Sequence, residues 1–338
     1  MPADLIVEIG NSHEGSLGIA TSFVDMVSAS GAKTVKFQMH LPEYESSKDE
    51  PFRTQFSLQD KSRIDYWKRV GFSQDEWRIL IDYVESKNLE FLCSPFSIEA
   101  AQWLLEDGRI KRWKIGSGEA TNYPLLDFMI ESNLPIILST GLVSWKELLQ
   151  IKTRFESKNY WNYITLMHCV SKYPTPLEES SLNIIDDLRS LECQVGLSDH
   201  SGDIAVPLLA YSRGISTIEV HLTPHKLFFG PDTIASLSTD EVRNFLELTS
   251  KWDKLNSNPN SRDQLFDSSR ETARIFRKGI YWKNDLPQGY KLSLKDLSFL
   301  KPASHFDAKD YESVLGQKTT RAVKAGFPIL PGDLGLND

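Results

Sequence analysis

The chain reads Trp113-Lys114-Ile115-Gly116-Ser117-Gly118-Glu119 about a third of the way along its length. A short apolar strand here runs through a lysine into a glycine-rich turn that carries a serine and a glutamate. Glycine lets backbone N–H groups approach a ligand closely, while the lysine and the serine offer a positive charge and a hydroxyl to an oxyanion. We therefore expect Lys114, Ser117 and Glu119 to belong to a site for an anionic substrate that also needs proton transfer.

Apolar runs of this kind recur along the chain and alternate with amphipathic helical patterns. The eight runs are Leu5–Ile9, Thr34–Gln38, Glu90–Ser94, Arg112–Ile115, Ile136–Ser139, Ile164–Cys169, Gln194–Ser198 and Thr217–His221. Continuous apolar strands that alternate with helices are typical of a parallel β/α architecture. Eight such units predict a closed (β/α)₈ TIM barrel over residues 1–255.

Three of the expected helices begin with a capping box. A serine is followed three residues later by a glutamate at Ser73 and Glu76, at Ser144 and Glu147, and at Ser238 and Glu241. The widest gap between runs, residues 40–72, is polar and aromatic. We expect it to form a loop over the mouth of the barrel.

The pattern changes towards the C-terminus. Residues 256–272 are polar and look like a linker. Beyond them, Gly289-Tyr290 followed by Asp296-Leu297 is echoed, at the same interval, by Gly326-Phe327 followed by Asp333-Leu334. Two pseudo-repeated halves predict a small, mostly β domain over residues 273–338.

Composition excludes several classes of partner. The 338 residues are 40% hydrophobic and 25% charged, as in ordinary globular proteins. A net charge of −8 argues against a nucleic-acid or anionic-membrane surface. No apolar run approaches the roughly 20 residues of a membrane span, and we expect no signal peptide at the N-terminus. Because the three cysteines form no CxxC pair, we expect a reduced, cytoplasmic protein.

Polar residues stand at the carboxyl end of every predicted strand, which is where a (β/α)₈ barrel carries its active site. In chain order they are Glu8; Lys36 and Gln38; Ser94; Lys114, Ser117 and Glu119; Ser139; Cys169 and Ser171; Ser198 and His200; and His221. Two lysines and several hydroxyls at one mouth suit a ligand that carries a phosphate and a carboxylate. One polar strand end would be explained more simply by local capping, but eight in register favour a site.

His200 and His221 follow neighbouring strands, so their imidazoles are expected side by side. Neutral imidazoles bind divalent metals, and two of them with water suit Mn²⁺, or else Mg²⁺ or Co²⁺, better than a structural zinc. His13 could bind substrate or hold its loop in place. His168 lies within an apolar strand and is more simply a core residue. Cys169 ends a strand, but no basic group is clearly available to activate it as a nucleophile.

These motifs, in this order, resemble the sialic acid synthase family, whose members condense phosphoenolpyruvate with an aldose to make nonulosonic acids. The resemblance runs nearly end to end. It is carried by Glu8-Ile9-Gly10 with His13-Glu14-Gly15, Val35–Gln38, Ser94-Pro95-Phe96, Lys114–Glu119 with Asn122-Tyr123-Pro124, Leu138–Gly141, His168-Cys169 with Tyr173–Pro176, Gly196–His200, His221 and Gly230-Pro231-Asp232. The C-terminal segment resembles that family's antifreeze-like (SAF) domain.

The resemblance implies a role for each matching residue. It implies that phosphoenolpyruvate binds Lys36, Ser94, Lys114, Ser117, Ser139 and Ser198, that the metal binds His200 and His221, and that the sugar binds Glu8, Gln38, Glu119, Tyr173 and Asp232. Glu8 and Glu119 are then the candidates for proton transfer, with Lys114 as the third catalytic residue. The resemblance also implies a homodimer whose SAF domains are exchanged between subunits.

Three departures from the family pattern concern the sugar half of the site. Ser171 stands where an asparagine is common, and Thr223-Pro224-His225-Lys226 replaces a more usual Thr-Leu-Asp-Lys. Lys301-Pro302-Ala303 replaces an Arg-Pro-Gly turn, and lysine lacks the planar fork of arginine. We therefore expect the acceptor to be an N-acetylmannosamine-like or related aldose rather than necessarily N-acetylmannosamine itself.

The predicted reaction is a metal-dependent condensation of phosphoenolpyruvate with an aldose, which yields a 2-keto-3-deoxy sugar acid and phosphate. Two alternatives remain from the residues alone. A pyruvate aldolase would use Lys114 to form a Schiff base. A non-catalytic sugar-binding homologue would keep the fold without the reaction.

Overall fold

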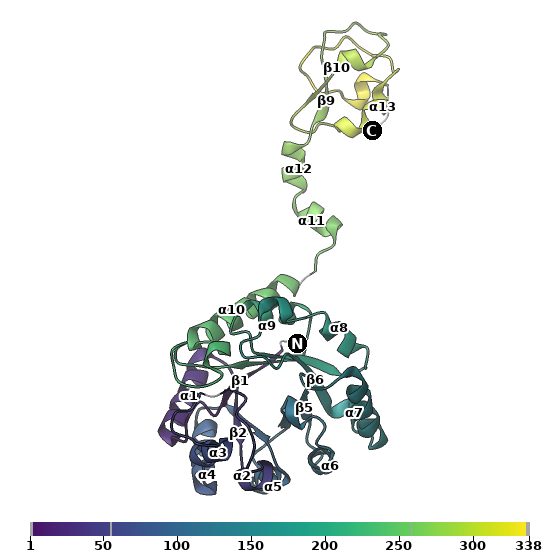
Figure 1. The fold of residues 1–338 in the computed structure, drawn as a ribbon. Coiled ribbons are helices and arrows are strands. Elements are labelled where there is room, and N and C mark those ends of the chain that lie inside the picture. The colour runs from purple at the N-terminus through teal and green to yellow at the C-terminus, as the bar shows by residue number, and fades with distance from the viewer. Residues whose placement is uncertain (1–2, 55, 258, 336–338) are drawn as a thin grey trace. The chain divides into compact units, whose positions relative to one another are not determined.

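The structure, a computed structural model, describes residues 3–54, 56–257 and 259–335 (Figure 1). The chain forms two compact units, Met1–Asn256 and Ser257–Asp338. No helix in the described ranges is both long and apolar enough to cross a membrane.

The first unit contains one sheet of eight parallel strands, each within two residues of a predicted run. The strands are β1 (Asp4–Gly10), β2 (Thr34–Met39), β3 (Glu90–Pro95), β4 (Trp113–Ile115), β5 (Ile136–Ser139), β6 (Ile164–Cys169), β7 (Gln194–Asp199) and β8 (Thr217–His221). Their order is β3-β2-β1-β8-β7-β6-β5-β4, so the first strand pairs with the last. β3 and β4, the two ends of this order, lie next to each other. The predicted TIM-like barrel is confirmed.

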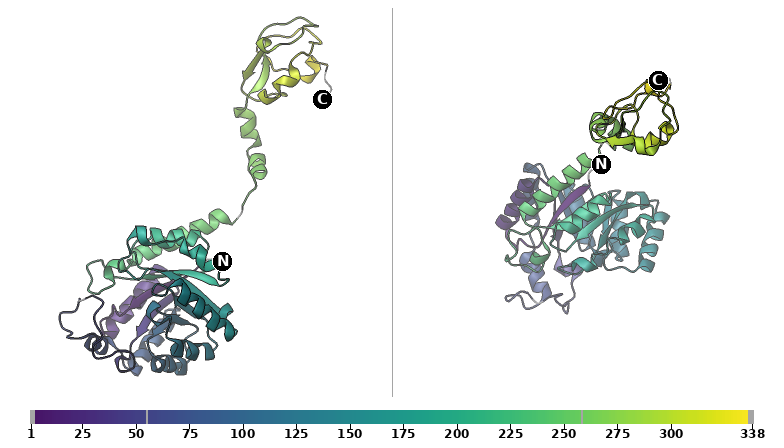
Figure 2. Two further views of the ribbon diagram at one scale, coloured as in Figure 1. Left: turned by 45° about the vertical axis from the view of Figure 1, so that its right-hand side comes forward. Right: turned by 90° about the horizontal axis from the view of Figure 1, so that it is seen from above.

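Each strand is followed by a helix that lies outside the barrel (Figures 1 and 2). These helices are α1 (Leu17–Ser30), α4 (Gln74–Ser86), α5 (Ile98–Asp107), α6 (Tyr123–Glu131), α7 (Trp145–Ser157), α8 (Ile184–Arg189), α9 (Ala205–Ser212) and α10 (Thr239–Asn256). The three predicted capping boxes are confirmed at the starts of α4, α7 and α10.

The barrel interior has an apolar layer beneath a polar one. Ile6, Leu92, Ile137 and Met167 form a separate buried cluster. Each stands two residues before a polar strand end, and residues two apart on a strand share a face. The apolar layer therefore forms the floor under the polar residues that the sequence places at the mouth.

The segment between β2 and β3 differs from the expected loop, because it contains two short helices, α2 (Pro42–Glu45) and α3 (Arg63–Val70). Ser62 caps α3 by accepting a hydrogen bond from the Asp65 N–H. Tyr66 and Trp67 are buried in a small cluster against which Phe52 and Phe56 pack. The aromatic residues that suggested a loop are thus the core of a small cap over the barrel.

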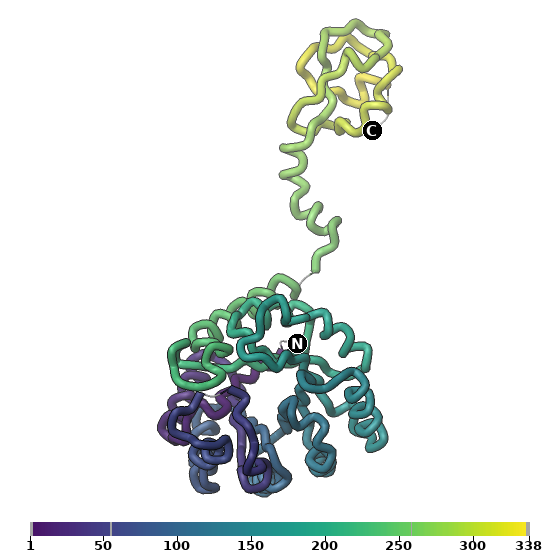
Figure 3. The backbone as a smooth tube through the Cα atoms, in the orientation of Figure 1, coloured from purple at the N-terminus to yellow at the C-terminus, as the bar shows by residue number. Residues whose placement is uncertain are grey.

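The second unit begins with α11 (Arg262–Ser268) and α12 (Arg270–Phe276), which bury none of their residues and lie where a linker was expected (Figure 3). The predicted domain start at residue 273 falls inside α12. Strands β9 (Gly279–Trp282) and β10 (Leu297–Leu300) pair antiparallel, and α13 (Tyr311–Val314) follows. Around them, Ile280, Trp282, Val314 and Ile329 are among the residues of a separate core.

The pseudo-repeat of this unit is visible in its backbone. Gly289 and Gly326 both have positive φ, at 78° and 83°. Asp296 and Asp333 each end a 3₁₀ turn, and each carboxylate accepts a hydrogen bond from the backbone N–H three residues earlier. The repeated sequence therefore makes the same turn twice.

We expect Gly196→Ala, in β7, to destabilise the barrel. A Cβ at this position would overlap with Met167 Sδ and lie 2.5 Å from the Thr217 carbonyl oxygen of the next strand. Overpacking of this kind costs about 1–3 kcal/mol, which urea denaturation would measure. Gly118→Ala is the matched control, because a Cβ there meets nothing within 4 Å. Equal stability of the two variants would contradict the prediction.

Candidate functional site

A cavity of about 490 Å³ opens at the carboxyl ends of the barrel strands. Among the residues that line it are thirteen of the predicted strand-end and site residues: Lys36, Gln38, Ser94, Lys114, Ser117, Ser139, Cys169, Ser171, Tyr173, Ser198, His200, His221 and Asp232. Phe52, Arg53, Arg63 and Trp67 from the β2–β3 segment also line it. That segment therefore covers the mouth, as predicted.

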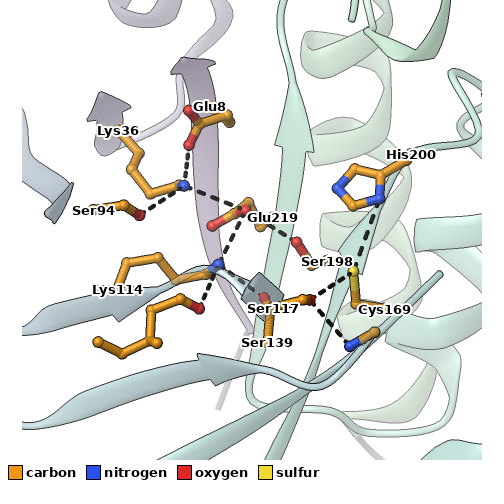
Figure 4. A network of polar contacts seen from close by, with 12 residues as sticks. Glu8, Lys36, Ser94, Lys114, Ser117, Ser139, Cys169, Ser198, His200 and Glu219 are labelled. Atoms are coloured by element: carbon orange, nitrogen blue, oxygen red, sulfur yellow. Dashed lines mark hydrogen bonds and ion pairs between the residues drawn. The ribbon is translucent and has the colours of Figure 1, made fainter. Parts of the chain in front are cut away.

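Two buried lysines lie on either side of one buried carboxylate at the base of this cavity (Figure 4). Glu219 Oε1 is 3.5 Å from Lys36 Nζ and 3.4 Å from Lys114 Nζ. Lys36 also pairs with Glu8. Two positive and two negative side chains thus compensate one another, as burial of charge requires.

The surroundings shift the pKa values of the two lysines in opposite directions. Burial alone would lower the pKa of Lys36, but Glu219 and Glu8 together outweigh it and raise that pKa above its usual value. Burial lowers the pKa of Lys114, which Glu219 opposes and neighbouring Lys36 reinforces. Burial would raise the pKa of Glu219, yet the lysines prevail and lower it to about 2. Glu219 is therefore held ionised between them.

Glu219 is a functional candidate that the sequence analysis missed. It stands two residues before His221 in β8, so both side chains face the barrel interior. A glutamate inside an apolar strand, in step with a candidate ligand, is the signal that would have found it.

Serine hydroxyls surround the charged group. Ser94 accepts from Lys36 Nζ at 3.3 Å, and Ser139 accepts from Lys114 Nζ at 2.8 Å. Ser198 donates to Glu219 at 3.0 Å. Ser117 Oγ accepts from the Gly141 N–H at 3.0 Å, which joins the glycine-rich turn to the loop after β5. Cations, hydroxyls and a backbone donor together suit an oxyanion.

His200 and His221 lie side by side, with ring centres 5.2 Å apart, and both are buried. The Nδ1 of His200 lies 2.9 Å from the Val170 carbonyl oxygen, which fits an Nδ1–H tautomer and leaves Nε2 as the possible ligand. Burial and the neighbouring His221 lower the pKa of His200 to about 3, so its ring is neutral, as a metal ligand must be.

The donor set fits an open metal site and not a closed one. Within the described ranges, no group of three or more His, Cys, Asp or Glu side chains is arranged to hold a metal. Two imidazoles that face a cavity leave further coordination positions to water and substrate, as in catalytic sites.

The outer part of the cavity is built around Tyr173. Its ring stacks on His200 with centres 4.0 Å apart, and its hydroxyl lies 3.0 Å from His200 Nε2. Arg53 lies over the Tyr173 ring at 4.1 Å from its centre and donates to Asp232 Oδ1 at 2.6 Å. Arg53 was not singled out from the sequence, because its partner lies 179 residues away.

Three predicted site residues are not among those that line the cavity. Glu8 is buried beneath it and pairs with Lys36. Glu119 accepts from Asn122 Nδ2 at 2.7 Å, and partial burial raises its pKa. Lys301 belongs to the second unit, where its Nζ lies 5.3 Å from the Phe276 ring centre.

The remaining histidine and cysteine candidates have local partners. His13 is buried against Phe72, and its Nδ1 accepts from the Gly15 N–H at 3.2 Å, so it holds its loop. His168 is a core residue, as expected, and bonds the Ser180 carbonyl oxygen. Burial raises the pKa of Cys169, whose sulfur contacts Ser117 and His200. A protonated thiol is a poor nucleophile.

Comparison with known proteins places this architecture in a family. The model of the NeuB family matches residues 23–260, and that of the SAF domain matches residues 277–335. N,N'-diacetyllegionaminic acid synthase of Campylobacter jejuni is 31% identical over 95% of this chain and 96% of its own length. Pseudaminic acid synthase of Helicobacter pylori is 28% identical and covers 98% of both chains. The crystal structure of N-acetylneuraminic acid (sialic acid) synthetase from Leptospira borgpetersenii, in complex with citrate, superposes with a TM-score of 0.70 at 29% identity, over 80% of this chain and 92% of the other. The chain belongs to the NeuB family and carries a C-terminal SAF domain.

Proposed function

We propose that the protein condenses phosphoenolpyruvate with an aldose to give a nonulosonic or other 2-keto-3-deoxy sugar acid and phosphate, with a divalent metal as cofactor. The observation that carries this proposal is the group of two buried lysines and four serine hydroxyls beside two neighbouring histidines in one cavity. The names of the relatives, which are synthases of nonulosonic acids, support it.

In the proposed reaction, C3 of phosphoenolpyruvate forms a bond to the aldehyde carbon, and a water oxygen adds to C2. The C2–O bond to phosphate then breaks and leaves a keto group. Lys36 and Lys114 would hold the phosphate and carboxylate, with Ser94, Ser117, Ser139 and Ser198 as donors. Charge-assisted bonds of this kind are the strong ones. Because both lysines are already paired, the substrate must share or displace their carboxylate partners.

A divalent metal held by His200 and His221 would supply a Lewis acid for the aldehyde oxygen. Mn²⁺ is the ion we favour, with Mg²⁺ and Co²⁺ as alternatives. Tyr173 would keep the ring of His200 in place by stacking. Glu219 keeps Lys36 protonated and, as an ionised carboxylate, orients the Ser198 hydroxyl by accepting its hydrogen bond. Exchange of SAF domains within a homodimer stays a prediction.

One observation favours a second candidate, a pyruvate aldolase. Burial lowers the pKa of Lys114, and a neutral amine is what Schiff-base formation requires. Incubation with pyruvate and borohydride, followed by mass spectrometry, separates the two functions. A covalent adduct on Lys114 would support the aldolase, because the condensation proposed above needs no imine.

We expect Lys114→Ala to raise the KM for phosphoenolpyruvate and to lower kcat, because a charge-assisted contact worth about 1.5–3 kcal/mol is lost. Lys114→Arg should rescue incompletely, since the larger guanidinium must fit a buried position. Release of phosphate is the assay. Exposed Lys111 precedes the same strand, and Lys111→Ala is the control. Unchanged phosphoenolpyruvate affinity in Lys114→Ala would show that the anion binds elsewhere.

Glu219→Gln should destabilise the substrate-free protein by roughly 3 kcal/mol, because two buried ammonium groups lose a shared carboxylate. Without Glu219, the pKa of Lys114 falls further below its unfolded value, so the unfolded state binds more protons. The free energy of unfolding of the variant then rises with pH. Its difference from the wild-type value should therefore shrink between pH 6 and pH 9. Denaturant titrations at both values test this, with exposed Glu247→Gln as the control. A deficit that does not depend on pH would contradict the electrostatic explanation.

Chelation should abolish turnover, and Mn²⁺ should restore it. His200→Ala and His221→Ala should each lower kcat by several orders of magnitude and reduce bound metal in elemental analysis, because a metal contributes several kcal/mol of charge stabilisation. His225 follows the same strand as His221 but is exposed, and His225→Ala should keep both metal and activity. Full turnover in excess chelator would disprove metal dependence.

A further inference from the structure

His40 directly follows β2, where the barrel joins the segment that covers its mouth. Its ring is stacked between Trp67 of α3, with ring centres 3.8 Å apart, and Phe96, which follows β3, with ring centres 4.2 Å apart. The residue is buried. The partners of its two ring nitrogens therefore decide which of them carry protons.

Both ring nitrogens of His40 face oxygen atoms that accept hydrogen bonds. Nδ1 lies 2.5 Å from Glu45 Oε1, and Nε2 lies 3.3 Å from Gln38 Oε1. The other oxygen of the Glu45 carboxylate accepts from the Leu41 N–H at 3.2 Å, which holds the carboxylate beside the ring. An imidazole donates from both nitrogens only when it is protonated to the imidazolium.

The orientation of the Gln38 amide distinguishes the imidazolium from a neutral ring. A neutral ring that donates from Nδ1 would need a donor at Nε2, so the Gln38 nitrogen would have to face His40. Instead, Gln38 Oε1 faces His40 and also accepts from Asn11 Nδ2 at 3.2 Å. The Gln38 nitrogen lies towards Glu8, because a Cβ on Gly10 would be 3.6 Å from Gln38 Nε2 and 3.2 Å from Glu8 Oε1.

The surroundings favour this orientation and the charge that goes with it. Glu8 Oε1 is buried and accepts no hydrogen bond from the described residues. If the Gln38 amide turned over, its carbonyl oxygen would face this carboxylate in place of the N–H groups. The faces of Trp67 and Phe96 add to the preference, because aromatic faces attract a cation.

Two further titratable groups lie near His40 and Glu45. Burial lowers the pKa of His13 to about 3, and His40 adds to that effect, so this second imidazole is neutral. Burial raises the pKa of Glu119, with Glu45 adding to that effect and His40 opposing it. Glu45 contacts the His40 ring directly, so we expect its carboxylate to set the charge of that ring.

We propose that His40 is an imidazolium that bridges Glu45 and the Gln38 carbonyl, so that Gln38 presents its N–H groups, and not its oxygen, to the cavity. Gln38 lines the cavity and His40 does not, which makes His40 a positioning residue. The substrate atom that meets Gln38 must then be an accepting oxygen. The effect on turnover rests on the function proposed above, whereas the charge of His40 does not.

The charge of His40 can be measured in the metal-free, substrate-free protein. After labelling with ¹⁵N-histidine, long-range ¹⁵N–¹H correlation at pH 7 should show two protonated ring nitrogens for His40, assigned by the signal that disappears in His40→Gln. Glu45→Gln should give the pattern of a neutral imidazole, because the carboxylate that favours the charged form is gone. A neutral pattern in the wild-type protein would overturn the proposal, whether or not the variants fold.

The consequence for Gln38 is tested by phosphate release from phosphoenolpyruvate with N-acetylmannosamine at pH 6 and pH 8. Glu45→Gln should keep the sugar kcat/KM within about twofold of wild type at pH 6, where the ring can still take up its second proton. At pH 8 it should fall to roughly a tenth of the wild-type value, through the sugar KM, because the amide turns over and a hydrogen bond to the substrate is lost. The KM for phosphoenolpyruvate should change less than about twofold. Glu43→Gln, an exposed change on the same helix α2, is the control.

The outcomes separate the charge of His40 from a merely structural role of Glu45. An equal loss at both pH values would show that Glu45 acts on the fold, and no loss at pH 8 would show that Gln38 needs no fixed orientation. Either result overturns the proposal, as does an equal rise in the KM for phosphoenolpyruvate. If neither N-acetylmannosamine nor a panel of other aldoses releases phosphate, the proposed function fails, and the ¹⁵N spectrum still decides the state of His40.

Discussion

The rest of the barrel depends on one constraint, which is the burial of two lysines, Lys36 and Lys114, beside a single carboxylate, Glu219. Two ammonium groups removed from water would each cost several kcal/mol without a partner, and Glu219 reaches both. Glu219 is on the last strand, whereas the lysines are on the second and fourth. Only pairing of β1 with β8 brings that carboxylate between them. The strand pairing that closes the barrel therefore also places the carboxylate that balances the charge of the two lysines.

The strands could be predicted because each is an apolar run with a polar end, and the interior layers follow from the two-residue period of a strand. The sequence pattern does not predict which residues face one another across the interior of the barrel. Which interior side chains face one another depends on strand tilt and stagger, which leave no local mark in the sequence. This is why the pairing of Glu219 with Lys36 and Lys114 was not predicted, although its place two residues before His221 could have marked it as an interior residue. The same limit explains Glu119, which shares a motif with Ser117 but turns to Asn122 and away from the cavity lining.

The cap between β2 and β3 marks a second limit of sequence reasoning. Its aromatic residues lack a sustained helical period, so they indicated only a loop, yet they pack on one another around the short helix α3. Arg53 and Asp232 are 179 residues apart in the sequence, so no local pattern could predict their ion pair. In contrast, the repeated turns of the C-terminal unit were predictable, because each is defined by a glycine and an aspartate only seven residues apart.

The inner half of the cavity is formed by residues of the strands and the outer half by residues of the loops, and this difference affects which half can change its specificity. The inner lysines, serines and histidines stand on strands or directly at their ends, where hydrogen bonding to neighbouring strands leaves them little freedom. Arg53, Tyr173 and Asp232 stand on loops and are held by one another through stacking and a single ion pair. Loops tolerate substitution and insertion far better than barrel strands do. Under the proposed function, changes in the outer loops would alter which sugar is accepted, while the buried lysines proposed to bind phosphoenolpyruvate and the carboxylates that balance their charge would stay the same.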